Sequence, residues 1–199
     1  ILFVIPGLVM LSVITNSYME VVSTFFFAKF FSRNIDEILV SPTPPSVIIA
    51  GFIASGVVRG MLVGFLVLIV SLFFALPAVA HPFVVVLFLF LSSLVFSLGG
   101  LINGIYAKNF DGVFIVPTFV LTPLVYLGGV FYSIHSLPPL WQTISLFNPI
   151  FYLINGFRYG FLGTSDVPFL TCFLVLLALM LVLLGVNIYF LKKGLGLKQ

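Results

Sequence analysis

Two charged side chains lie inside otherwise apolar runs of this sequence, and they are its first candidates for chemistry. Glu20 falls within a run over residues 1–27, and Arg59 within a run over residues 47–76. A lone charge in hydrocarbon is costly, so each needs a partner or a polar cavity. We predict an ion pair between Glu20 and Arg59, on the half of both runs nearest their connecting loop. The alternative is that one of them faces a transport route or exchanges a coupling proton.

The remaining polar residues do not assemble into a recognisable catalytic pattern. His135, Arg158 and Asp166 are expected on the same, outer side of the membrane, but nothing in the sequence assigns a nucleophile, base and orienting group among them. HExxH, GxSxG and GxxxxGK[ST] motifs are absent from the sequence, and Cys172 is its single cysteine. We therefore predict that this chain is not an enzyme, holds no metal or cofactor, and leaves any ATP to another polypeptide.

Composition indicates where such a chain resides. Of its 199 residues, 62% are hydrophobic and 7% are charged, whereas a soluble domain carries roughly a quarter charged residues. The net charge is +3 with no basic run beyond Lys192 and Lys193, so nucleic acid is not an expected partner. We predict an all-α integral membrane protein in a lipid bilayer. Because Ile1 opens inside an apolar run, we also expect further residues before it in the complete protein.

The apolar runs predict five spans, over residues 1–27, 47–76, 83–106, 113–130 and 168–191. A helix needs about 20 apolar residues to cross a bilayer. In the second run Gly56, Gly60 and Gly64 are four residues apart, which places them on one helix face where a neighbouring backbone can approach. We predict a packing face, although membrane helices are rich in glycine in any case.

Prolines interrupt the later part of the chain. Pro117 and Pro123 fall inside the fourth run and predict a kinked or broken helix. Residues 131–167 hold two apolar pieces, each too short to span, separated by Asn148 and Pro149. We predict an outer re-entrant helical hairpin whose break at Asn148 is buried in protein, because non-helical backbone survives in a membrane only where it is covered.

The loop over residues 28–46 carries a short helix signal. Asn34 is a suitable N-cap with Glu37 three residues later, and Pro42 ends the segment. Ile35, Ile38 and Leu39 form one apolar stripe, whereas Asp36 and Glu37 point elsewhere. So short a helix must dock to be stable. It either lies on the membrane surface or is offered to a soluble partner.

Lysine and arginine counts predict the orientation of the chain. Lys29, Arg33, Lys108 and the C-terminal lysines fall on one side of the expected spans, against Arg158 on the other. Because short cytoplasmic loops are enriched in Lys and Arg, we expect the loop 28–46 and the C-terminus to be cytoplasmic.

Three stretches of the sequence resemble the permease subunits of ABC-2 type transporters. They are RNIDEILVSPTPP at 33–45, VPTFVLTPLVYLGGVFYS at 116–133 and LPPLWQTISLFNPIFYLINGFRYGFLG at 137–163. The block that contains Pro117, Pro123, Asn148, Pro149 and Arg158 carries the resemblance most specifically. The likeness is greatest to bacterial exporter permeases that pair with a separate ATPase.

The resemblance implies a single permease domain over residues 1–199, with five of six spans present and an outer re-entrant hairpin. It implies that Asn34, Ile35, Asp36, Glu37, Ile38 and Leu39 form a coupling helix that contacts an ABC ATPase. ATP and Mg would be held by that ATPase, and a second copy of the permease would complete the transporter in a bacterial inner membrane. The cargo would be a hydrophobic or amphipathic molecule. The alternative function is a proton-coupled secondary transporter that uses Glu20.

Overall fold

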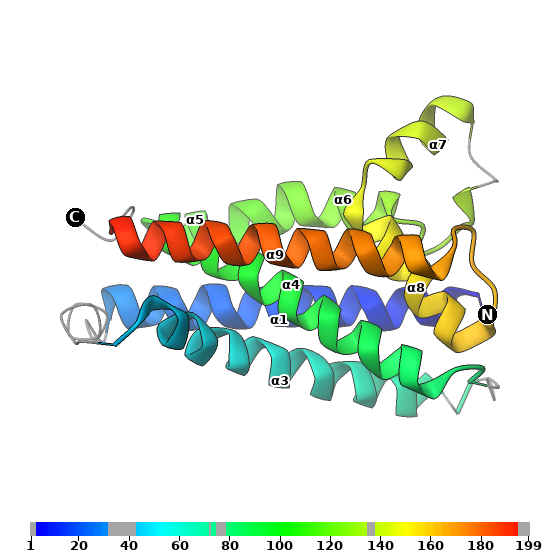
Figure 1. The fold of residues 1–199 in the computed structure, drawn as a ribbon, viewed down its shortest axis with the longest axis horizontal. Coiled ribbons are helices and arrows are strands. Elements are labelled where there is room, and N and C mark those ends of the chain that lie inside the picture. The colour runs from blue at the N-terminus through cyan, green and yellow to red at the C-terminus, as the bar shows by residue number, and fades with distance from the viewer. Residues whose placement is uncertain (1–2, 32–42, 72, 75–78, 135–137, 195–199) are drawn as a thin grey trace.

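The chain folds into a bundle of helices. The computed structural model describes residues 3–31, 43–71, 73–74, 79–134 and 138–194, and the regular structure within them is helical (Figure 1). The helices are α1 (Val4–Phe30), α3 (Pro45–Ser71), α4 (Pro82–Tyr106), α5 (Phe110–Val116), the π-helical segment η1 (Pro117–Leu121), α6 (Thr122–Leu127), α7 (Pro139–Leu146), α8 (Pro149–Leu162) and α9 (Phe169–Lys193).

Five candidate membrane spans are present in the described part of the chain. Four are the single helices α1, α3, α4 and α9, and the fifth is the continuous stretch Phe110–Leu127 made by α5, η1 and α6. All are long and apolar enough to cross a bilayer, and they run along the long axis of the molecule (Figure 1). The expected all-helical fold is therefore confirmed in the described residues, with five candidate spans.

Helix boundaries differ from the expected ones by a few residues, for local reasons. α1 continues to Phe30 because Phe26 and Phe30 pack on each other and Phe26 also contacts Phe110. The fourth span is Phe110–Leu127 and not 113–130, because the Asn109 side chain accepts a hydrogen bond from Gly112 N and starts the helix early.

The second and fifth expected spans also shift. α3 begins at Pro45, since proline suits the first turn of a helix, and its described part ends at Ser71. α9 covers Phe169–Lys193 and ends at Gly194, whose positive φ of 62° is a common helix terminator.

The core lies where α1 and α4 pack together. α1 also packs against α3, and α4 also packs against α8 and α9. Met10 and Ile14 of α1, Phe88 and Leu89 of α4 and Phe157 of α8 are almost completely buried in this core. Helix α8 thus belongs to the packed bundle although it is too short to span a membrane.

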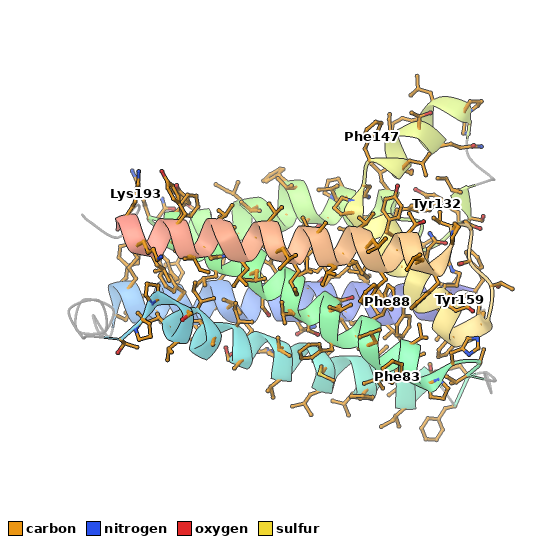
Figure 2. All side chains as sticks on the ribbon, viewed as in Figure 1. Phe83, Phe88, Tyr132, Phe147, Tyr159 and Lys193 are labelled. Atoms are coloured by element: carbon orange, nitrogen blue, oxygen red, sulfur yellow. The ribbon has the colours of Figure 1, made fainter. Side chains whose placement is uncertain are left out.

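Helix α7 is different, because it projects away from the bundle (Figure 1). Ser145 is its one buried residue, and the apolar side chains of Leu140, Trp141 and Ile144 are exposed, as is Phe147 directly after it (Figure 2). An exposed apolar helix of this kind requires a membrane or a protein partner to cover it.

One end of the bundle gathers the lysines. Lys193 lies at that end, opposite Phe83 and Tyr159 (Figure 2). Lys29 Nζ donates to the carbonyl oxygen of Ile105, 2.9 Å away, which places the end of α1 beside the end of α4. We call this the lysine end; its members are Lys29, Lys108, Lys192 and Lys193.

Candidate functional site

The expected coupling helix lies outside the described residues. Asn34, Ile35, Asp36, Glu37, Ile38 and Leu39 all fall in the range 32–42. What the structure does place is the two helices that flank this segment. The end of α1 and the start of α3 both lie at the lysine end (Figure 1), so the segment between them joins two spans at that end.

Glu20 and Arg59 meet on neighbouring spans. Arg59 Nη1 contacts Glu20 Oε2, and Thr24 Oγ1 of the same α1 helix donates to Glu20 Oε1 over 3.4 Å. Glu20 lies on the half of α1 nearest the loop, as expected, whereas Arg59 lies at the centre of α3. The Arg59 side chain is 57% exposed and that of Glu20 is 22% exposed. The charge pair is therefore on the surface of the single chain.

The three glycines of α3 form a buried face against α1 and α4. A Cβ atom at Gly60 would lie 2.7 Å from Ser93 Oγ and would also collide with the Ser17 side chain. A Cβ at Gly56 would meet the carbonyl oxygen of Ser17, and one at Gly64 would meet Val13 and Leu89, both within 3 Å. Only glycine, which has no Cβ atom, allows the helices to approach this closely.

The prolines of the fourth span produce a π-helical segment. Pro117 has no N–H, so the carbonyl oxygen of Val113 loses its normal partner, and Asn103 Nδ2 of α4 donates to it instead over 3.2 Å. The Pro117 carbonyl accepts from the Thr122 backbone N–H and from its hydroxyl at 2.9 Å, which closes the wider π turn just before Pro123. The helix is therefore not broken at these prolines but contains a π-helical segment, and side chains satisfy the backbone carbonyl that Pro117 leaves without its normal partner.

Asn148 plays a similar part at the break between α7 and α8. It is buried, as the sequence predicts, and its Oδ1 accepts from Ile150 N at 3.0 Å and so caps α8. Its Nδ2 donates to the carbonyl oxygen of Leu124 in α6. One amide therefore starts α8 at Pro149 and fastens it to the end of the fourth span.

Arg158 is enclosed within the protein. Its side chain is 2% exposed, Nη2 donates to the carbonyl oxygen of Gly129 at 2.8 Å, and its guanidinium carbon lies 3.9 Å from the centre of the Phe3 ring. Nε and Nη1 have no hydrogen-bond partner among the described residues. The pKa of this guanidinium is lowered, because the effect of burial is larger than the opposing effect of the nearby Asp166 carboxylate.

Asp166 belongs to a polar cluster beside Arg158. Its carboxylate accepts from Ser133 Oγ at 3.1 Å, and its backbone N–H donates to Asn155 Oδ1 at 3.1 Å. Sequence reasoning placed Asp166 and Arg158 on one side of the membrane but missed this cluster, and His135 lies outside the described residues. The sequence pattern that could have predicted this polar cluster is Asn155 and Arg158, which are three residues apart in a mostly apolar helix.

A small apolar cavity of about 130 Å³ lies between α1, α4, α8, α9 and the fourth span. Tyr18, Phe96, Leu121 and Ile150 are among its lining residues. Within the described ranges, no group of three His, Cys, Asp or Glu side chains is placed to hold a metal ion.

Known proteins match this chain over most of its length. The family of ABC-2 type transporters matches residues 1–162. The inner membrane transport permease YadH of Escherichia coli K12 is 54% identical over 198 residues, which covers 99% of this chain and 77% of the relative. Nodulation protein J of Rhizobium leguminosarum bv. viciae is 24% identical over 171 residues, which covers 81% of this chain and 62% of that protein. The chain therefore belongs to the ABC-2 type transporter family, as a permease, the membrane subunit that carries out no catalysis itself.

Proposed function

We propose that this chain is the permease of an ATP-driven exporter in a bacterial inner membrane, and that it moves a hydrophobic or amphipathic molecule. The observation that carries the proposal is the 54% identity to an inner membrane transport permease, over nearly the whole chain. The sequence contains no P-loop, so a separate ATPase subunit binds ATP and Mg.

The segment Asn34–Leu39 is the proposed coupling element. Supporting this, its two flanking helices lie at the lysine end, and α1 and α3 pack against each other at Gly56, Gly60 and Gly64. A push on the segment would therefore move two packed spans together. Ile35, Ile38 and Leu39 would contact the ATPase, with Asp36 and Glu37 facing basic residues on its rim.

The lysine end would then be cytoplasmic, in agreement with the distribution of basic residues in short loops. In this orientation α7 and α8 lie on the outer side and form the proposed re-entrant hairpin. Their lengths of 8 and 14 residues are too short to span, and the exposed apolar side chains of α7 suit the membrane interface. We propose one permease domain over residues 1–199 within a six-span protein, paired with a second copy.

Crosslinking in the full-length permease, co-expressed with a candidate P-loop ATPase, tests this function. A cysteine at Ile38 should crosslink to a cysteine in the ATPase cleft, and Ile38→Asp should abolish both ATPase association and ATP-driven transport. Thr143→Cys in the exposed part of α7 is the matched control and should give no crosslink.

The opposite outcome would support the alternative function. If no ATPase associates and transport stops when the proton gradient is removed, the chain is a secondary transporter. Glu20→Gln should then abolish transport while the protein remains folded. The observed contact between Glu20 and Arg59 favours the exporter, because it gives Glu20 a structural partner on the neighbouring span.

A further inference from the structure

One face of α1 carries a continuous line of polar side chains. Its members, none of them buried, are Ser12, Thr15, Asn16, Glu20, Ser23 and Thr24. They recur every three or four residues, so they share one side of the helix, and we call them the α1 polar stripe. From Ser12 to Thr24 the stripe is roughly 18 Å long at 1.5 Å per residue, which is more than half of a bilayer core of about 30 Å.

Ser12, Thr15, Asn16 and Thr24 of the stripe each donate a hydrogen bond within their own helix. Ser12 Oγ donates to Leu8 O at 3.0 Å, Thr15 Oγ1 to Leu11 O at 2.8 Å, and Asn16 Nδ2 to Ser12 O at 2.9 Å. The outward-facing capacity that remains is mainly that of acceptors, namely hydroxyl lone pairs and the amide oxygen of Asn16. Such a surface suits a molecule that brings hydrogen-bond donors.

Arg59 adds a positive charge beside the stripe. A guanidinium has five N–H donors, and in the described structure the contact with Glu20 uses Nη1. The Arg59 side chain is also more exposed than that of Glu20, at 57% against 22%, so the positive member of the pair lies nearer the surface of the bundle. The outward side of this pair therefore offers donors and positive charge to an anionic group.

The exposed faces of α3 and α9 lack this polarity. The exposed large residues of α3 around Arg59 include Val58, Leu62 and Leu66, and those of α9 include Leu174 and Leu181. These faces suit lipid, whereas charged and polar side chains at mid-span are costly in lipid and normally face protein or a water-filled cavity. The α1 polar stripe is thus singled out as a face that lipid does not cover.

We propose that the α1 polar stripe and Arg59 line a water-filled route for the transported molecule, and that Arg59 binds an anionic group of that molecule. The stripe acceptors receive hydrogen bonds from its hydroxyl or amide groups, so the cargo is an anionic amphipathic molecule. This inference rests on the proposed transport function.

Water access to the stripe tests the first half of the proposal. In the full-length permease with Cys172→Ala, single cysteines replace Thr15, Asn16 or Ser23 and react with a membrane-impermeant charged methanethiosulfonate. Leu174→Cys and Leu181→Cys, on the exposed face of α9, are matched controls. The stripe cysteines should react at least roughly tenfold faster than these controls, because the reactive thiolate forms only where water reaches it.

Equal and slow reaction at stripe and control positions would overturn the water-filled route. It would mean that a second copy or another segment seals this face. Association with the ATPase would be unaffected by that result, so the failure of the route would be distinguishable from the failure of the proposed function.

The charge preference tests the role of Arg59. Ser55→Cys lies one turn before Arg59 on α3 and is partly exposed. An anionic sulfonatoethyl reagent should react with it about threefold faster than a cationic trimethylammonioethyl reagent of matched intrinsic reactivity, since a nearby charge changes local ion concentration. The preference should vanish in Glu20→Gln with Arg59→Gln, and should persist in Arg59→Lys. Absence of a preference in the unaltered pair would overturn anion recognition.

Discussion

Arg158 in α8 donates a hydrogen bond from Nη2 to the carbonyl oxygen of Gly129, 2.8 Å away. Gly129 has a φ of 82°, a conformation that glycine adopts without strain, and it follows the end of α6. This one bond therefore ties the short helix α8 to the turn that leaves the fourth span. Because Arg158 is buried, both its charge and its geometry matter to the packing of the end of the bundle opposite the lysine end.

Replacing Arg158 should destabilise the end of the bundle opposite the lysine end. Arg158→Gln loses the hydrogen bond to Gly129 and the contact with the Phe3 ring, at an expected cost of about 2 kcal/mol or more. Thermal unfolding of the purified full-length protein measures this. Arg158→Lys keeps the positive charge but loses the planar guanidinium group, so we expect it to be only partly as stable as the unaltered protein. An unchanged melting temperature for Arg158→Gln would contradict the structural role.

The glycine face of α3 gives a prediction with a control in the same helix. Gly60→Ala should lower stability by about 1–3 kcal/mol, because its Cβ would meet Ser17 and Ser93. Gly51→Ala has nothing within 4 Å of the new methyl group and should be neutral or slightly stabilising. Melting temperatures of both variants decide the matter. Equal effects would mean that the close approach of α1, α3 and α4 is not tight.

The pair formed by Glu20 and Arg59 should behave as a coupled unit. Arg59→Gln leaves the Glu20 carboxylate unpaired near the middle of a span, so it should reduce the yield of folded protein more than the double change to Gln does. A double-mutant cycle should give a coupling of about 1 kcal/mol or more. Additive effects of the two single changes would show that the contact contributes nothing to stability.

The π-helical segment can be tested through the bond that replaces its missing donor. Asn103→Leu removes the amide that donates to Val113 O, at an expected cost of about 1–2 kcal/mol for an unsatisfied buried carbonyl. In a Pro117→Ala background an alanine N–H is available to that carbonyl, so Asn103→Leu should cost less. The free energy of unfolding is measured for the unaltered protein, Asn103→Leu, Pro117→Ala and the double variant. This double-mutant cycle separates the hydrogen bond to Val113 O from the other contacts of Asn103. An equal cost in both backgrounds would contradict the account.

Several features follow from the sequence because their causes are local. The length of each apolar run decides whether it can span a bilayer, and all five expected spans are present as helices. Pro117 and Pro123 interrupt the fourth span because each lacks an N–H, and Asn148 begins α8 because its side chain caps the next turn. The spacing of Gly56, Gly60 and Gly64 likewise defines one face of a helix whatever its surroundings.

The tertiary structure decided which side chains meet. Asn103 reaches Val113, Arg158 reaches Gly129, and Arg59 lies at mid-span beside Glu20. A helix that is apolar on nearly every side has no pattern that fixes its rotation or its neighbours, because lipid and protein interior are equally apolar. The rotation and the neighbours of each helix are instead set by close packing at glycines and by a few hydrogen bonds and ion pairs between distant parts of the chain. These contacts depend on the tertiary structure and not on local sequence.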